Sequence, residues 1–218
     1  MFSLADRRRA AAVFLSLAGV AALSACSDSP DPGANAAQSP TASASETASS
    51  PSPSPSPSAT YKPASADGPA ENVPLPVMPE EAKVESKEGL IAFARHWYDL
   101  ANYGYETGDV EPLWNISGPD CFACKNYSDS VESGYVRDDW MAGSKITVQG
   151  VDSTYARTPE GRVQALVQFI QEPLEFYGPS GLLSTLEGNS VSSVQMVEAT
   201  YSDGRWTAVD VVTIHEGK

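Results

Sequence analysis

Residues 86–108 have the sequence SKEGLIAFARHWYDLANYGYETG, and this stretch decides the fold of the chain. At about 100° per residue, its apolar and small side chains fall on one face of a helix with Trp97 near the centre. Ser86 suits the N-cap of such a helix, and Gly108 suits its C-terminal end. The pattern therefore predicts an amphipathic helix anchored to the core by one face: Leu90, Phe93, Ala94, Trp97, Tyr98, Ala101, Gly104 and Tyr105.

Downstream of this helix the apolar residues first keep a helical spacing and then recur at every second residue, as they do in strands. Asp109 suits the cap of a short helix, and a longer helix is expected from about Pro119 to Gly134. Alternating apolar residues then predict strands at 144–155, with a bulge at Gly150, and at 163–169, 191–201 and 205–215. Residues 172–190 are rich in Gly and Pro and are expected to form an extended hairpin tip or a mobile loop. This order predicts an α+β fold in which N-terminal helices pack on a curved, four-stranded antiparallel sheet.

The composition changes abruptly upstream of the helix. Residues 27–73 consist mainly of Ser, Pro, Ala and Thr and include PSPSPSPS at 51–58. Such a segment cannot bury a core, so it is predicted to be a disordered tether, and the prolines at its end favour an extended lead-in. The predicted organisation is a signal peptide at 1–26, a tether at 27–73 and a single α+β domain at 74–218.

The first 26 residues have the features of an export signal. Three arginines at 7–9 precede an uncharged run at 10–23, which is shorter than the roughly 20 apolar residues that cross a bilayer. Leu23-Ser-Ala-Cys26 then resembles the lipobox of bacterial lipoproteins. The resemblance implies cleavage before Cys26, a lipid on its thiol and a location on the outer face of the cytoplasmic membrane. The alternative is an ordinary signal peptide with a chance cysteine.

The chain is acidic, with a formal net charge of −14, and loss of the arginine-rich signal peptide would make it more acidic. A surface of this sign repels phosphate backbones, so nucleic acid is excluded as a partner. Contact with the membrane is expected only through the lipid on Cys26.

Cys121 and Cys124 are the two cysteines that remain once Cys26 carries a lipid. Outside the cytoplasm this pair is expected to be oxidised, and residues three apart on a helix have Cα atoms about 5–6 Å apart, which a disulfide accepts. The ring is small, so the bond would stabilise the fold by only about 2 kcal/mol. A thiol-disulfide exchange site is the alternative, but Asp120 beside Cys121 disfavours a thiolate. Two cysteines supply only half of a zinc site, so no metal site is predicted.

Candidate catalytic groups are few. The sequence has neither a glycine-rich phosphate loop nor a Gly-x-Ser-x-Gly nucleophile elbow. His96 and Asp99 are three residues apart, as a base and its orienting carboxylate could be, but both lie off the apolar stripe and are expected to face water.

Asp210 departs from the pattern of the last predicted strand. Asp210 is four residues from Trp206, so a regular strand would place both side chains on the same face. Together with Trp97 they could line a pocket in which burial raises the pKa of the Asp210 carboxyl. The alternative is that Val209 and Val211 face the core and Asp210 faces water.

The helical cover, the Thr107-Gly-Asp109 junction and the closing Asp203-Gly-Arg-Trp206 hairpin are similar to the cone-shaped fold of nuclear transport factor two and ketosteroid isomerase. With the lipobox, the tether and residues 93–98 and 117–124, they resemble an actinobacterial lipoprotein family that is catalogued only as a domain of unknown function. The resemblance covers most of residues 74–218. It implies a compartment and a cone-like fold, but no activity.

These observations favour a non-enzymatic, membrane-tethered module that binds an envelope protein, a cell-wall component or a small ligand and needs no cofactor. One alternative is an isomerase-like or hydrolase-like enzyme that uses a pocket in the cone, and another is a thiol-disulfide redox protein. A deep pocket that holds Asp210 would favour the enzyme, whereas a filled cone with an exposed apolar patch would favour the binding module.

Overall fold

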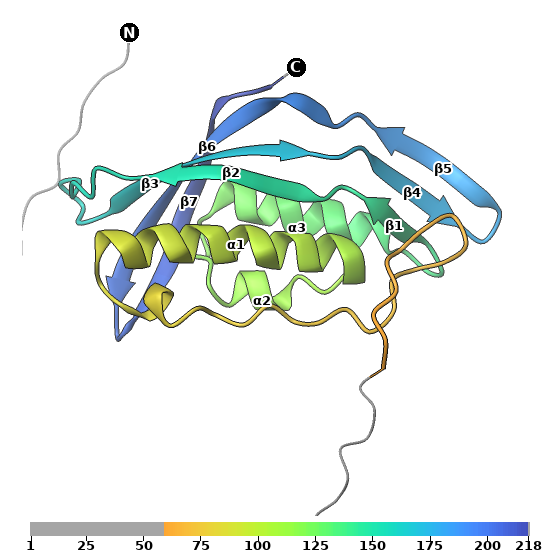
Figure 1. Ribbon diagram of the computed structural model, residues 1–218, viewed down its shortest axis with the longest axis horizontal. Coiled ribbons are helices and arrows are strands. Elements are labelled where there is room, and N and C mark those ends of the chain that lie inside the picture. Colours follow the sequence, from red (N-terminus) through yellow and green to blue (C-terminus); the bar gives the residue numbers. More distant parts are fainter. Residues whose placement is uncertain (1–58, 218) are drawn as a thin grey trace, which may run out of the picture. The chain divides into compact units, whose positions relative to one another are not determined.

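The computed structural model describes residues 59–217. The predicted signal peptide, the predicted lipidation site Cys26 and the predicted tether up to residue 58 lie outside the described residues. Figure 1 shows the helices on one side of the sheets. The elements follow in the order η1 (Glu81–Lys83), α1 (Lys87–Thr107), α2 (Glu111–Trp114), α3 (Phe122–Gly134), β1 (Trp140–Gly143), β2 (Ile146–Asp152), β3 (Val163–Gln171), β4 (Leu174–Gly178), β5 (Gly181–Leu186), β6 (Asn189–Ser202) and β7 (Arg205–His215).

Helix α1 begins and ends where the sequence predicts. The Ser86 hydroxyl accepts a hydrogen bond from the Gly89 N–H at 2.9 Å, and Gly108 ends the helix with a left-handed φ of 78°. The predicted face of the helix is buried in the core, with Phe93 fully inaccessible and Trp97 only 4% exposed. Burial of each large apolar side chain contributes about 1.5–3 kcal/mol, so this face is a main source of stability.

The strands form two antiparallel sheets. The four-stranded sheet has the order β2-β3-β6-β7, which is the predicted meander, and the extra residue in β2 falls between Val148 and Gly150. A second sheet has the order β1-β4-β5. Residues 172–190 therefore form a hairpin, as one interpretation predicted, and the mobile-loop interpretation is wrong.

Three breaks at one level separate the two sheets. Pro173, between β3 and β4, has no N–H to donate to a ladder, and its carbonyl accepts a hydrogen bond from the Ser144 N–H at 2.8 Å. Gly143 and Ser144 have φ values of 75° and 61°. A Cβ on Gly188, between β5 and β6, would lie 2.6 Å from the Pro173 nitrogen. These residues interrupt neighbouring strands at the same level. The chain therefore passes between the two sheets at one place in each of these strands.

The folded domain begins earlier than predicted. Backbone hydrogen bonds close residues 62–71 into a small hairpin, and the Trp140 indole N–H donates to a carbonyl of this hairpin at 2.8 Å. The Tyr61 hydroxyl donates to the Glu106 carboxylate at 2.9 Å. Residues 59–73, which the sequence assigns to the tether, thus contact β1 and the end of α1.

The segment before α1, residues 73–84, which we call the lead-in, buries a flank of α1 that was expected to face water. Gly89, His96 and Tyr103 are seven residues apart, so they share one side of the helix. Residues 81–84 contact this side at Gly89, and residues 73–76 lie beside Tyr103. His96, between them, is only 4% exposed, and its Nδ1 has no hydrogen-bond partner among the described residues. The prediction of a solvent-exposed His96–Asp99 pair is therefore wrong for His96, whereas Asp99 is exposed.

Gly89→Ala is expected to destabilise the domain by about 1–3 kcal/mol, because the new Cβ would lie 2.0 Å from the Val84 carbonyl oxygen. At a solvent-exposed position of a helix, Gly→Ala stabilises the fold by up to about 1 kcal/mol. The sign of the change in unfolding free energy therefore tests the contact between Gly89 and Val84. Urea unfolding followed by tryptophan fluorescence would measure the change. Gly150→Ala is the control, because its Cβ would have no neighbour closer than 4.0 Å. A stabilised Gly89→Ala variant would contradict the packing of residues 81–84 on α1.

The unfolding free energy is expected to decrease as the pH falls from 7 to 5, and His96→Leu is expected to reduce this decrease. Burial lowers the pKa of His96, and the nearby Asp99 carboxylate only partly opposes this effect. As the pH falls, His96 is therefore protonated first in the unfolded chain, near the ordinary histidine pKa of about 6.5. This protonation stabilises the unfolded chain relative to the folded chain. Urea unfolding at a series of pH values would measure the effect. The exposed His215 is the control: His215→Gln is expected to keep the wild-type pH dependence, and a His96→Leu profile parallel to wild type would refute the prediction.

Candidate functional site

A small cavity lies between α1, α3 and the four-stranded sheet. Its volume is about 120 Å³, and its lining is mainly aromatic and aliphatic: Trp97, Tyr98, Ala101, Tyr105, Ala123, Tyr127, Ile146, Phe169, Gln171, Gln195 and Val211. Neighbouring rings are in contact, for example Trp97 with Tyr98 at 5.1 Å and Tyr105 with Tyr127 at 5.0 Å between centroids. Aromatic side chains thus fill most of the space beneath the helices, and what remains would hold only about four waters.

The polar groups of this cavity are uncharged. The Tyr98 hydroxyl donates to Gln195 Oε1 at 2.7 Å, and the Tyr127 hydroxyl donates to the Ala101 carbonyl at 2.5 Å. Burial raises the pKa of Tyr98, Tyr105 and Tyr127, so these phenols stay protonated at neutral pH. The lining therefore offers hydrogen bonds to a small neutral molecule, but no group that would take up or release a proton near pH 7.

The two candidate tryptophans lie in different places. Trp97 lines the cavity and donates through Nε1 to the Ser117 hydroxyl at 3.2 Å. Trp206 is buried, but its Nε1 donates to the Val84 carbonyl at 3.0 Å and its ring contacts Tyr201. Trp206 therefore holds the end of the lead-in and is not among the residues that line the cavity.

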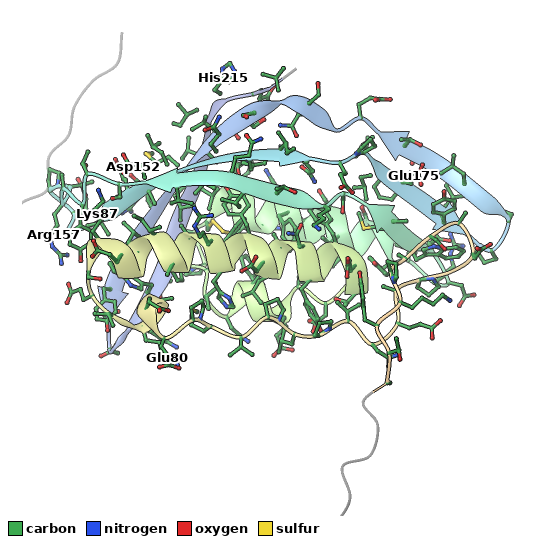
Figure 2. The ribbon with its side chains drawn as sticks, in the orientation of Figure 1. Glu80, Lys87, Asp152, Arg157, Glu175 and His215 are labelled. Carbon is green, nitrogen blue, oxygen red and sulfur yellow. A yellow bond between two sulfur atoms is a disulfide. The ribbon has the colours of Figure 1, made fainter. Side chains whose placement is uncertain are left out.

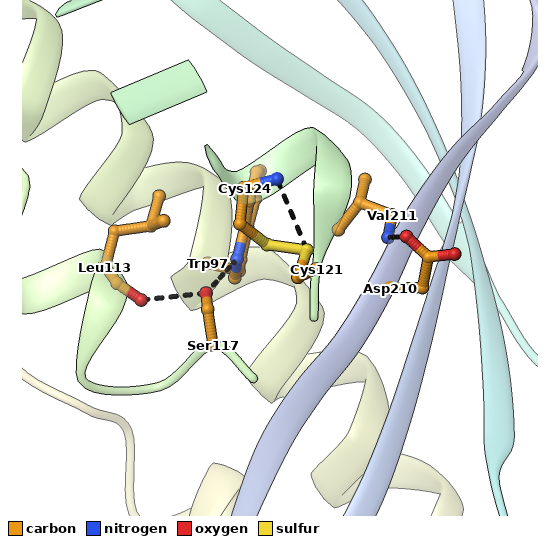
Figure 3. The surroundings of a disulfide bond; sticks show 7 residues. All are labelled: Trp97, Leu113, Ser117, Cys121, Cys124, Asp210 and Val211. Atoms are coloured by element: carbon orange, nitrogen blue, oxygen red, sulfur yellow. Dashed lines mark hydrogen bonds between the residues drawn. A yellow bond between two sulfur atoms is a disulfide. The ribbon is translucent and has the colours of Figure 1, made fainter. Parts of the chain in front are cut away.

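A β-bulge turns Asp210 away from the cavity. Ala199 pairs with Ala208 and Glu198 with Asp210, so Val209 is an extra residue on β7. The bulge reverses the alternation: Trp206 and Ala208 are buried before it, and Val211 is buried after it. Asp210 Oδ1 accepts a hydrogen bond from the Val211 N–H at 2.9 Å, and Val211, not Asp210, lines the cavity (Figure 3). The pocket expected around Asp210 is not formed by the described residues.

The disulfide between Cys121 and Cys124 lies beside Trp97 and β7 (Figure 3). Both residues are fully buried, and Cys121 Sγ accepts a hydrogen bond from the Cys124 N–H at the start of α3. Thiol-disulfide exchange requires access of a thiolate to a sulfur atom, so burial favours the structural role over the redox role.

The larger candidate site is a surface groove that we call the α1 groove. It is a hollow of about 460 Å³ between the lead-in and the outer side of α1, formed by Tyr61, Val73, Pro74, Leu75, Pro76, Asp99, Asn102, Tyr103 and Glu106. A second hollow of about 330 Å³ shares three of these residues and extends over residues 141–145 and Glu172. The two hollows meet at Asn102, whose side chain is fixed by hydrogen bonds to both backbone groups of Ile146.

The α1 groove combines apolar walls with carboxylates. Asp99 and Glu106 are seven residues apart on α1, which is about 10 Å along the axis. Neither carboxylate forms an ion pair within the described residues, in which six other pairs occur. Partial desolvation raises the pKa of Asp99, and burial together with the bond to Glu106 raises the pKa of Tyr61. A positively charged group between the two carboxylates would also meet the rings of Tyr61 and Tyr103.

The sequence contained one signal for this groove. Asp99, Asn102 and Glu106 recur at helical spacing opposite the apolar stripe, which is the pattern of any solvated helix face. The wall formed by residues 61–76 could not be recognised, because proline-rich residues next to a tether carry no periodicity that indicates docking.

Nowhere in residues 59–217 do three His, Cys, Asp or Glu side chains gather closely enough to hold a metal ion. None of the helices in the same range has both the length and the apolar character needed to cross a membrane.

Solved structures with a similar arrangement are distant in sequence. The intermembrane-space region of the chloroplast protein ARC6 is 11% identical, with 61% of this chain and 99% of that chain covered and a TM-score of 0.41. A periplasmic fragment of TraM is 9% identical, with 61% and 100% covered and a TM-score of 0.36. An uncharacterised protein with a cystatin-like fold from Caulobacter vibrioides is 12% identical, with 56% and 87% covered and a TM-score of 0.32.

No curated protein matches the sequence. A family pattern, in contrast, matches residues 59–212, which include the hairpin at 62–71, the α1 groove and most of β7. The match also begins at the first residue that the structure describes. This chain belongs to the family of unknown function DUF6318.

Proposed function

We propose that this protein is a lipid-anchored envelope module that binds a positively charged, partly apolar ligand in the α1 groove. The observation that carries the proposal is the contrast between the cavity beneath the helices and the α1 groove. The space beneath the helices is about 120 Å³ and uncharged, whereas the α1 groove is about 460 Å³ and carries two carboxylates that form no ion pair among the described residues, although Arg95 lies close enough to Asp99 to offset part of its charge.

The shape of the groove favours an extended ligand. Its floor follows one side of α1 from Asp99 to Glu106, and its outer wall is the extended segment 73–76. In an extended chain every second side chain lies on the same face and the rise is about 3.3 Å per residue, so lysines two or four residues apart lie about 7 or 13 Å apart. Their flexible side chains can span the difference from the roughly 10 Å between the two carboxylates. The apolar wall, with Leu75 54% exposed, would receive the aliphatic stems of these lysines.

The N-terminal sequence supports the proposed compartment. The lipobox at residues 23–26 implies a lipid on Cys26, and residues 27–58 separate that anchor from the domain. The buried disulfide is consistent with an oxidising compartment. In this proposal the net charge of −14 serves recognition, because an acidic surface attracts positively charged ligands over distances of about a Debye length.

A labelled peptide of alternating lysine and valine is expected to bind the protein, and its glutamate counterpart is not. Neutralising both groove carboxylates with Asp99→Asn and Glu106→Gln is expected to weaken binding about tenfold, because two charge pairs are lost. Fluorescence anisotropy at low and high salt would measure the affinity, which should fall as salt rises.

The control for this experiment is Glu88→Gln, an exposed glutamate in the first turn of the same helix, outside the groove. It changes the net charge by the same sign but leaves the groove intact. Glu88→Gln removes one charge where the groove variant removes two, so a loss of about threefold in Glu88→Gln would show that the peptide responds to overall charge. Equal binding of the glutamate peptide would refute a cation site.

The lipid anchor is tested by Cys26→Ser in the full chain. The wild-type protein is expected to incorporate an alkyne-labelled fatty acid and to sediment with membranes, whereas the variant should lose the label because no thiol remains at the lipobox. Click labelling of membrane and soluble fractions would measure both outcomes. A variant that keeps the label would place the modification elsewhere.

A further inference from the structure

We infer that strand β5 lies on the lipid bilayer to which the chain is anchored and inserts its leucines between the lipid headgroups. Leu182, Leu183 and Leu186 are 56%, 55% and 57% exposed. All residues from 182 to 186 are exposed, although most of them are leucines. The inference rests on the proposed lipid anchor, to which it adds a second membrane contact, but not on the proposed ligand of the α1 groove.

The position of β5 in the second sheet leaves one of its edges open. The strand order is β1-β4-β5, and β5 pairs with β4 alone. Figure 1 shows β5 at the outer edge of this sheet, with none of the other described elements beyond it. Apolar side chains that are this exposed, and that gather on one protruding strand, indicate a surface that contacts another body.

A β-bulge argues against a further protein strand as the occupant of this edge. Phe176 pairs with Ser184 and Tyr177 pairs with Leu182, so Leu183 is an extra residue on β5. A bulge disrupts the regular row of N–H and C=O groups, and proteins use this device to keep edge strands from pairing with other chains. A lipid surface, in contrast, needs no regular row of backbone groups. It needs only apolar side chains that project from the fold.

The hairpin that carries these leucines is uncharged, although the chain is strongly acidic. Residues 176–186 contain no Asp, Glu, Lys or Arg, whereas the whole chain has a net charge of −14. The neighbouring carboxylates lie outside this run: Asp139 precedes β1, and Glu187 follows β5. Glu175 lies on β4, nearer to the inner end of the hairpin than to its tip (Figure 2). The domain can therefore touch a bilayer with β5 without moving a carboxylate out of water.

The anchored end of the chain enters the domain at the same sheet. Residues 27–58 separate Cys26 from the described domain, and a flexible chain of about 30 residues spans about 30 Å. The chain then contacts β1, where Trp140 Nε1 donates to the Ser65 carbonyl at 2.8 Å. Strands β1 and β5 flank the same strand β4. An anchor this close gives the bilayer a high effective concentration at the leucines, so weak insertion is enough to keep β5 on the membrane.

The open edge of β5 limits the depth of insertion. Backbone N–H and C=O groups without partners do not enter the hydrocarbon core, so the β5 backbone stays among water and headgroups. Only the leucine side chains reach the start of the acyl chains. This depth is that of interfacial segments, which bury apolar side chains about 5–10 Å into the boundary between headgroups and acyl chains.

The inference is tested with the lipidated full chain in phosphatidylcholine vesicles. Leu183→Cys adds one free thiol for an environment-sensitive fluorophore, because the lipid blocks Cys26 and Cys121 is bonded to Cys124. Lipids brominated near the headgroup are expected to quench this label at least about twofold, and more than lipids brominated near the end of the acyl chain, because insertion is shallow. The matched control is a label at Leu166→Cys, a leucine of the other sheet that is 47% exposed, which should stay unquenched.

Leu182→Glu together with Leu186→Glu should abolish the quenching of the label at position 183, because insertion would then remove carboxylates from water. Circular dichroism would confirm that this variant is folded. An unquenched label at position 183 in the vesicle-bound chain, or equal quenching at position 166, would overturn the inference. A blue shift of the label in the absence of vesicles would show that β5 contacts protein instead, which also overturns it. A chain that does not sediment with the vesicles would refute the proposed anchor and, with it, this inference, so the two failures are told apart.

Discussion

The structure depends on the burial of α1 on two sides at once. One side, centred on Trp97, packs on the sheet, and the flank through Gly89 and His96 is covered by the lead-in. Only the third side, with Asp99 and Glu106, is left to solvent, and the lead-in forms the wall beside it. The same contact that stabilises the domain therefore creates the α1 groove, which is why the groove belongs to the same folded unit as residues 59–76.

A single extra residue decides the chemistry beneath the helices. Without the bulge at Val209, β7 would keep its alternation and present Asp210 beside Trp206 to the interior. With the bulge, Val211 takes that place, and the cavity is lined by aromatic rings, amides and aliphatic groups. Such a lining has no acid or base with a pKa near neutrality, so the interior is suited to packing, and the surface grooves are suited to binding.

The two faces of the domain have different electrostatic characters. The carboxylates of the α1 groove form no ion pair within the described residues, whereas Asp152 and Glu198 on the sheet pair with Lys87 and Arg162. The proposed ligand site therefore follows from carboxylates that lack an ion pair, not from the total charge.

The sequence by itself determined α1 with its two caps, the alternation in β3, the four-stranded meander and the pairing of Cys121 with Cys124, because each depends on local spacing along the chain. It also carried the lipobox, which no part of the described structure concerns. Only the tertiary structure decided the burial of His96, the second sheet, the docking of residues 59–76 and the orientation of Asp210. These depend on contacts between distant segments and on the bulge at Val209, and a local pattern cannot encode which segment covers a helix flank or where one strand gains a residue over its neighbour.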